Sequence, residues 1–171
     1  MFASLRRFQA SPAYTQVMGA IKQDLKQAMI AKNKVEKNTI RSVLSSIKNS
    51  EIDGGKQTEF DLYKLFNKMV KQRTESEQLY TSQQRQDLAE VEAQESVIIR
   101  KYLDALPVAS EKEVSEKTEK WLAELHEKDG SSLQLKDIMK QVTDDFASNW
   151  NTFPAAIRAT IPQLYKKIWG N

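Results

Sequence analysis

The sequence predicts an all-α protein, with four helices in an N-terminal subdomain and three in a smaller C-terminal one. Apolar residues recur at three- and four-residue spacings along most of the chain. Strong helix formers dominate, and the 171 residues include only 5 glycines and 4 prolines. No stretch alternates apolar and polar residues for long enough to predict a strand.

Four amphipathic helices are expected in the N-terminal part, over residues 12–32, 35–52, 59–80 and 87–106. The first should begin at Ser11-Pro12, because serine caps a helix and proline suits its first position. Thr58 is the expected cap of the third helix.

The apolar stripes of these helices predict which residues are buried. In the first helix the stripe runs from Val17 to Met29, and in the fourth it passes through Val91 and Ile98. Glu95 interrupts the fourth stripe at a position where an apolar residue is expected.

Three shorter helices are expected in the C-terminal part, over residues 111–129, 133–142 and 154–168. Ser110 and Glu113 form a capping box before the first of them. Pro162 lies inside the last and is expected to kink or split it, because proline lacks the N–H that a helix interior uses.

The chain is therefore expected to comprise residues 11–108 and 109–171 as two helical subdomains, preceded by residues 1–10. That first segment contains Arg6 and Arg7, weakly amphipathic apolar residues and no acid. This composition is typical of mitochondrial presequences, and a disordered terminus that happens to contain two arginines is the alternative.

The distribution of charge is more informative than its sum. The formal net charge is +3, but residues 1–50 hold nine basic and two acidic side chains, while residues 51–130 hold twelve basic and eighteen acidic ones. The sequence has no cysteine and one histidine, which excludes disulfides, thiol chemistry and His- or Cys-rich metal sites. No apolar run is long enough to span a membrane. We expect no cofactor and no metal.

Catalytic motifs are not evident. Glu92 and Glu95 share a helical face and could act as an acid–base pair. Ion pairs within the bundle are the preferred interpretation, with Arg41 and Arg73 as the partners of Glu92, Glu95 or Asp87. The single histidine, His126, is expected to be a solvated helix residue.

Clustered basic residues are the candidate contacts for nucleic acid, because each neutralised phosphate releases counterions. Ordinary solvated lysines are the alternative. The candidate contact residues are Lys34, Lys37, Arg41, Lys71 and Arg73, with Lys136 and Lys140 as a second patch. For Arg41 and Arg73, the ion-pair role is preferred to contact with RNA.

A series of motifs in the middle of the chain carries a family resemblance. The motifs are K-x-R-x-E-S at 71–76, R-x-D-L at 85–88, then Glu92, Glu95, Ile98 and Tyr-Leu at 102–103. Their order and spacing resemble those of the YqeY-like proteins, which are related to the tail domain of the GatB subunit of the glutamine-dependent tRNA amidotransferase. The resemblance extends over residues 11–169. Residues 11–15 and 29–32 resemble the fungal mitochondrial members of this family, which implies a mitochondrial protein, expected in the matrix.

The resemblance implies an all-α fold and a function connected with tRNA. In GatB the related tail helps to hold tRNA, while a separate catalytic domain, with no counterpart in this chain, transfers the amide. A label as a carbon–nitrogen ligase with glutamine as amido-N-donor would follow from the family alone. The leading hypothesis is thus a mitochondrial accessory module that binds tRNA or a tRNA–enzyme complex. The alternatives are a protein-interaction module that docks on a mitochondrial partner without RNA, and a stand-alone amide-transfer enzyme.

Overall fold

The computed structural model describes residues 10–129 and 133–170, and every regular element in these ranges is a helix. The prediction of an all-α fold is confirmed. The chain divides into two compact units, residues 1–107 and 108–171, which are described separately below. The expected presequence over residues 1–10 falls, apart from Ala10, outside the described residues.

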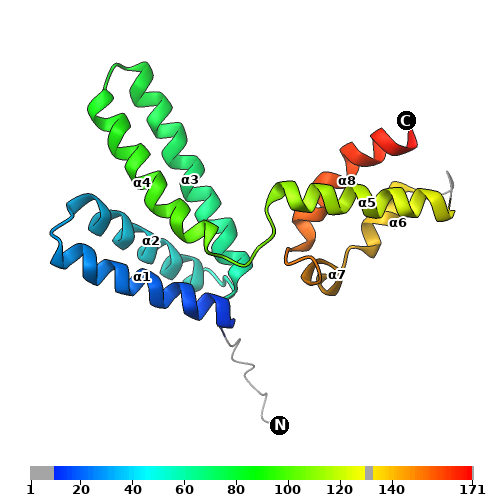
Figure 1. The fold of residues 1–171 in the computed structure, drawn as a ribbon, viewed down its shortest axis with the longest axis horizontal. Helices are drawn as coiled ribbons and strands as arrows, with labels where there is room; N and C mark the ends of the chain where they lie inside the picture. Colours follow the sequence, from blue (N-terminus) through cyan, green and yellow to red (C-terminus); the bar gives the residue numbers. More distant parts are fainter. Residues whose placement is uncertain (1–9, 130–132, 171) are drawn as a thin grey trace, which may run out of the picture. The chain divides into compact units, whose positions relative to one another are not determined.

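The first unit is built from two antiparallel helix pairs (Figure 1). The first pair is α1 (Pro12–Ile30) and α2 (Lys34–Ile52), and the second is α3 (Glu59–Ser82) and α4 (Gln86–Asp104). A three-residue connection joins the helices of each pair, and α2 also packs against α4. Their buried side chains form one apolar core that includes Ile21, Ile40, Phe66 and Ile99.

Two predicted helix starts are confirmed by capping hydrogen bonds. The Ser11 hydroxyl accepts from the Tyr14 N–H at 3.1 Å, and the Thr58 hydroxyl accepts from the Asp61 N–H at 3.3 Å. These bonds satisfy N–H groups that have no partner within the first turn of a helix.

Two predicted apolar stripes are misplaced. Met29 is 51 % exposed at the end of α1, and Val91 is 37 % exposed on α4. The buried side of α4 instead carries the small residues Ala89 and Ser96, followed by Ile99. Small residues let two helices approach closely, so a stripe drawn through the large apolar residues alone misses this face.

The second unit contains α5 (Glu111–Asp129), α6 (Leu135–Gln141), α7 (Asp144–Ser148) and α8 (Pro154–Trp169). The capping box is confirmed, because the Ser110 hydroxyl accepts from the Glu113 N–H while the Glu113 carboxylate accepts from the Ser110 N–H. α5, α6 and α7 all pack against α8. The residues buried between them are Val114, Leu122, Ile138, Val142, Ala147, Ile157, Ile161 and Leu164.

Two features of this unit differ from the prediction. The short helix α7 has no counterpart among the expected elements, because five residues are too few to show a helical period. Pro162 does not split α8, which runs from Pro154 to Trp169 as one helix, and the alternative of a kink at Pro162 stays a prediction. The proline ring lies on the exposed side, between the buried Ile161 and Leu164, so the packed face is uninterrupted.

Aromatic rings make two groups in the second unit. Trp121, Phe146 and Trp150 contact one another, with centroids 4.9 to 6.1 Å apart. His126 places its ring edge-on to Trp169 at 4.9 Å and is half-buried. The expectation that His126 is simply solvated is therefore wrong, and its ring packs against a neighbour in the fold.

Candidate nucleic-acid interface

The candidate interface begins with the stripe of basic residues on α2. Asn33 caps this helix by accepting from the Glu36 N–H at 3.2 Å and donating to the Glu36 carboxylate at 3.0 Å. From that start, Lys34, Lys37 and Arg41 follow at spacings of three and four, so they lie along one side. The buried residues Ile40 and Val43 lie on another side of the helix and hold it against the core.

The neighbouring helix α1 carries two further exposed lysines, Lys22 and Lys26. In an antiparallel pair with a short connection, positions equally far from the connection lie at the same level. Counted from Ile30 and Lys34, Lys26 is level with Asn38 and Lys22 with Ser42, the neighbours of Lys37 and Arg41 in sequence. Both α1 lysines are exposed. The sequence-based selection omitted them because one helix read alone does not reveal the register of its partner.

The charges of this helix pair are unbalanced. Residues 12–50 contain seven basic side chains and two acidic ones, a net charge of +5. The two acids already have partners, since Lys101 and Tyr102 bind Asp24 and Asn33 binds Glu36. Among the described residues none of the seven basic side chains forms an ion pair. We call these side chains the α1–α2 basic face: Lys22, Lys26, Lys32, Lys34, Lys37, Arg41 and Lys48.

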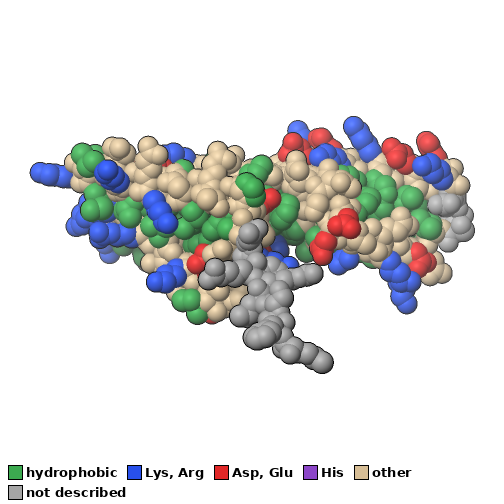
Figure 2. Space-filling model, turned by 90° about the horizontal axis from the view of Figure 1, so that it is seen from below, with side chains coloured by type: hydrophobic (Ala, Val, Ile, Leu, Met, Phe, Trp, Pro, Cys, Tyr) green, Lys and Arg blue, Asp and Glu red, His purple; other side chains and the backbone are tan. Residues whose placement is uncertain are grey.

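Figure 2 shows lysine and arginine side chains gathered over the end of the first unit where α1 and α2 are joined. Hydrophobic side chains lie among them, in keeping with the exposure of Met29 and Ile30 at the end of α1. The prediction of an ion pair for Arg41 is wrong. Its side chain is exposed and forms no ion pair among the described residues.

Arg73 behaves as the preferred interpretation predicted. Its Nη1 lies 3.2 Å from Glu92 Oε2 and its Nε lies 3.1 Å from Glu95 Oε2, which joins α3 to α4. All three side chains are largely shielded from solvent. Burial raises the pKa of Glu95 above its usual value, Arg73 opposes this shift, and Glu92 adds to it. The two carboxylates therefore form a structural ion-pair cluster.

The other predicted contact residues are separate from the basic face. Lys71, on α3, is exposed and makes a loose ion pair with Glu75 at 3.8 Å. Lys136 and Lys140 lie on α6 in the second unit, where Lys140 pairs with Asp137 at 2.9 Å. Of the predicted residues, the structure brings together Lys34, Lys37 and Arg41 on one surface.

The position of α1 on the bundle is held by Asp24. Its carboxylate accepts hydrogen bonds from Lys101 Nζ at 2.7 Å and from the Tyr102 hydroxyl at 2.8 Å. Burial alone would raise the pKa of Asp24, but the hydrogen bonds from Lys101 and Tyr102 outweigh it and the pKa lies below its usual value. Burial, followed by the bond to Asp24, raises the pKa of Tyr102. This contact fixes one edge of the α1–α2 basic face.

Other kinds of site find less support in the described ranges. Across residues 10–129 and 133–170, no three or more His, Asp or Glu side chains gather closely enough to hold a metal ion. None of the helices described is both long and apolar enough to cross a bilayer.

A further hydrogen-bonded group lies in the first unit, where the Tyr14 hydroxyl donates to Glu51, which also accepts from Gln57 at 2.9 Å.

Comparison with known proteins shows the family. The model of the Yqey-like protein family matches residues 18–158. The chain belongs to the YqeY-like family. This match includes the whole α1–α2 basic face, the ion-pair cluster of Arg73, Glu92 and Glu95, and most of the second unit.

Three relatives that match along most of their length are fungal. A protein of Clavispora lusitaniae is 54 % identical over 99 % of each chain. One of Meyerozyma guilliermondii is 42 % identical over 98 % of this chain and 87 % of its own, and one of Saccharomyces cerevisiae (strain YJM789) is 40 % identical over 95 % and 90 %. Each is named Altered inheritance of mitochondria protein 41, mitochondrial. These names support a mitochondrial location for this YqeY-like chain.

Proposed function

We propose that this YqeY-like protein is a mitochondrial accessory module that binds RNA, most specifically tRNA or a tRNA–enzyme complex, through the α1–α2 basic face. The observation that carries the proposal is the set of seven basic side chains without ion-pair partners among the described residues. A phosphate backbone would neutralise them and release its counterions, which is the main source of affinity in such complexes.

The contrast with Arg73 strengthens this choice of surface. A basic residue that already binds two carboxylates must give them up before it can bind a phosphate. Lys37 and Arg41 have no such competitor. The resemblance to the tRNA-holding tail of GatB points to the same class of ligand, and it favours a location in the mitochondrial matrix.

The proposed module holds RNA and leaves chemistry to a partner. The partly buried acids that could have served as general acids or bases, Glu92 and Glu95, are bound to Arg73. A carbon–nitrogen ligase reaction with glutamine as amide donor is therefore assigned to a partner enzyme. Turnover by the chain alone, with glutamine, ATP and misacylated tRNA, would contradict this assignment.

Filter binding of the full chain to mitochondrial tRNA, between about 50 and 200 mM salt, tests the proposal. The affinity is expected to fall steeply with salt. The double variant Lys37→Glu/Arg41→Glu should bind on the order of tenfold more weakly and should lower the salt slope by about 2, roughly 1 for each lost phosphate contact.

The matched control is Lys120→Glu/Lys128→Glu on α5, which makes the same change in net charge at exposed positions of the second unit. Its affinity should stay close to that of the unmodified chain. Equal weakening by both double variants would show that net charge alone acts, and a flat salt dependence would contradict RNA binding altogether.

A further inference from the structure

We propose that the turn between α1 and α2 binds reversibly to a bilayer surface that contains anionic phospholipids. The contact region is the α1–α2 tip, which we define as residues 26–37. Two exposed apolar side chains enter the interfacial layer of the bilayer, and the lysines around them bind the lipid phosphates. This contact goes beyond RNA binding and does not depend on it.

The turn of the α1–α2 tip has the same backbone structure as the turn between α3 and α4. Each turn has three residues, and the middle residue has a positive φ, 55° at Lys32 and 58° at Gln84. The Asn33 N–H donates to the Ala28 carbonyl at 3.0 Å, and the corresponding bond of the second turn measures 2.9 Å. These bonds belong to a Schellman motif, which ends a helix by satisfying its last carbonyls. Since the two turns close in the same way, the closure does not dictate how their side chains differ.

The side chains at the two turns differ in polarity. Met29 and Ile30, at the end of α1, are 51 % and 67 % exposed. The residues at the equivalent positions of α3 are Thr81 and Ser82, which are polar. Neither the closure of the turn nor burial in the core therefore accounts for an exposed apolar pair at the end of α1.

The two turns also differ in charge. Residues 26–37 contain four lysines and one acid, a net charge of +3, whereas the equivalent residues 78–89 contain one basic and one acidic side chain, a net charge of zero. In that second segment Arg85 already binds Asp87 at 3.1 Å. The lysines of the α1–α2 tip form no ion pair among the described residues. They are Lys26, Lys32, Lys34 and Lys37. Positive charge around an exposed apolar pair is complementary to an anionic lipid surface.

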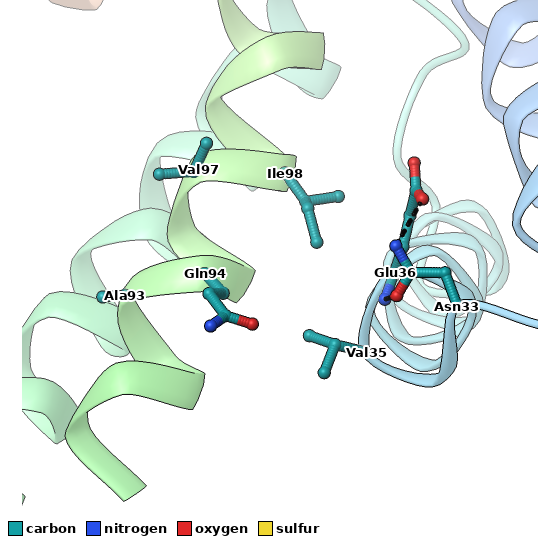
Figure 3. A pocket seen from close by; sticks show the side chains of 7 residues that line it. All are labelled: Asn33, Val35, Glu36, Ala93, Gln94, Val97 and Ile98. Carbon is teal, nitrogen blue, oxygen red and sulfur yellow. Dashed lines mark hydrogen bonds between the residues drawn. The ribbon is translucent and has the colours of Figure 1, made fainter. Parts of the chain in front are cut away.

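The acids near these lysines have partners within the fold. The Glu36 carboxylate accepts from the Asn33 side chain at 3.0 Å, and both residues line a hollow between α2 and α4 (Figure 3). Asp24, on α1 just before the tip, is bound by Lys101 at 2.7 Å. The charge around the exposed apolar pair is therefore mainly positive.

A bilayer matches both parts of the α1–α2 tip, and the other classes of ligand match only one. RNA phosphates would bind the lysines and leave the apolar pair in water. A stable protein interface buries about 800 Å² on each partner, and two apolar side chains are too few to form its core. An apolar segment needs to enter a bilayer by only about 5 to 10 Å to be stabilised, and a contact of this size is readily reversed.

Sedimentation of the full chain with vesicles, in the absence of RNA, tests the proposed contact. The vesicles contain either phosphatidylcholine alone or phosphatidylcholine with an equal amount of phosphatidylglycerol. We expect the chain to bind the anionic vesicles at least about tenfold more tightly than the neutral ones. Binding to the anionic vesicles should weaken as the salt concentration increases.

Two variants separate the apolar part of the contact from the charged part. Met29→Ser/Ile30→Ser should bind the anionic vesicles on the order of tenfold more weakly, because it removes the apolar area that leaves water. The matched control is Leu79→Ser/Val97→Ser on α3 and α4, where the side chains have similar exposures of 54 % and 67 %. This control should bind like the unmodified chain. Lys32→Gln, which copies the residue at the equivalent position of the second turn, should weaken binding by about fivefold.

A fluorescent dye shows which part of the chain enters the bilayer. The sequence contains no cysteine, so Ala31→Cys provides a single position for an environment-sensitive dye. Its emission should shift to shorter wavelength on anionic vesicles, because the dye leaves water. The matched control is Gln83→Cys, at the equivalent position of the second turn, where the emission should stay unchanged.

Three results would overturn the proposed contact. They are undiminished vesicle binding by the Met29→Ser/Ile30→Ser chain, equal binding of the unmodified chain to neutral and anionic vesicles, and a dye at position 31 that stays in water.

The same double variant separates this proposal from RNA binding. The affinity of Met29→Ser/Ile30→Ser for tRNA should equal that of the unmodified chain. If the variant loses tRNA affinity and keeps its vesicle binding, the apolar pair belongs to the RNA interface and the bilayer contact is wrong. If the unmodified chain binds no RNA, its binding to anionic vesicles should be undiminished.

Discussion

The two helix pairs of the first unit have the same architecture and use charge in opposite ways. In α3–α4, Arg73 is directed inward and binds Glu92 and Glu95. In α1–α2, Arg41 and the lysines have no ion-pair partner among the described residues, and the two acids are bound by Asn33 and Lys101. The comparison teaches that a count of basic residues does not measure a binding surface. What matters is how many of them lack an internal partner.

The largest expected effect comes from the apolar core that both pairs share. Phe66→Ala should lower the free energy of unfolding by about 3 to 5 kcal/mol, because Phe66 is fully buried and its removal leaves a cavity. Urea denaturation measures the change. Leu79→Ala, on the same helix but 54 % exposed, is the control and should cost less than about 0.5 kcal/mol. A small effect of the Phe66 variant would mean that ion pairs, not packing, hold the pairs together.

Arg73→Met sharpens the contrast between inward and outward charge. The variant leaves Glu92 and Glu95 shielded from solvent and without their ion-pair partner. The free energy of unfolding should fall by about 2 kcal/mol, which is less than the loss expected when a fully buried ion pair is broken. The affinity for tRNA, measured by filter binding, should not change. Loss of tRNA affinity with unchanged stability would place Arg73 in the interface instead.

Asp24→Ala tests the contact that holds α1 against α4. It should cost about 1 to 2 kcal/mol at neutral pH, because the Tyr102 hydroxyl loses its acceptor. Since the pKa of Asp24 is lowered by folding, its contribution is present above the ordinary aspartate pKa and is lost as the pH falls through the lowered value. The difference in the free energy of unfolding between the variant and the unmodified chain should therefore become smaller in acid, as urea titrations at several pH values would show. A difference independent of pH would contradict this.

The smallest effect on stability is expected at the α1–α2 basic face. Lys37→Glu and Arg41→Glu should each change the free energy of unfolding by less than about 0.5 kcal/mol, because neither side chain has an ion-pair partner to lose among the described residues. Thermal or urea unfolding measures this. A large destabilisation would show that these residues belong to the fold, and the contrast between the two pairs would fail.

The sequence predicts the local features of this fold well. The caps at Ser11, Thr58 and Ser110 are confirmed, because each depends on residues within one turn. The ion pair of Arg73 is confirmed as well. It could be predicted because Arg73 and Glu95, which have opposite charges, lie at or beside the apolar stripes of neighbouring helices. α7 escapes prediction because it is a single turn stabilised by its packing on α8.

The errors concern which side of a helix faces which neighbour. Arg41 and Met29 were expected inside, and both are exposed. Periodicity gives the stripe of a helix but not the position of the helix that covers it. For the same reason, the sequence alone does not place Lys22 and Lys26 near the level of Lys37 and Arg41, because this requires the antiparallel pairing of α1 and α2.

The bond between Asp24 and Tyr102 has a kinetic consequence. It joins positions 78 residues apart, whereas the contacts within each helix pair close across three-residue connections. Closing a long loop costs more chain entropy than closing a short one. The two pairs are thus expected to form early, with α1 reaching α4 after the rate-limiting step. Loss of the Asp24 carboxylate should then accelerate unfolding and leave the refolding rate nearly unchanged.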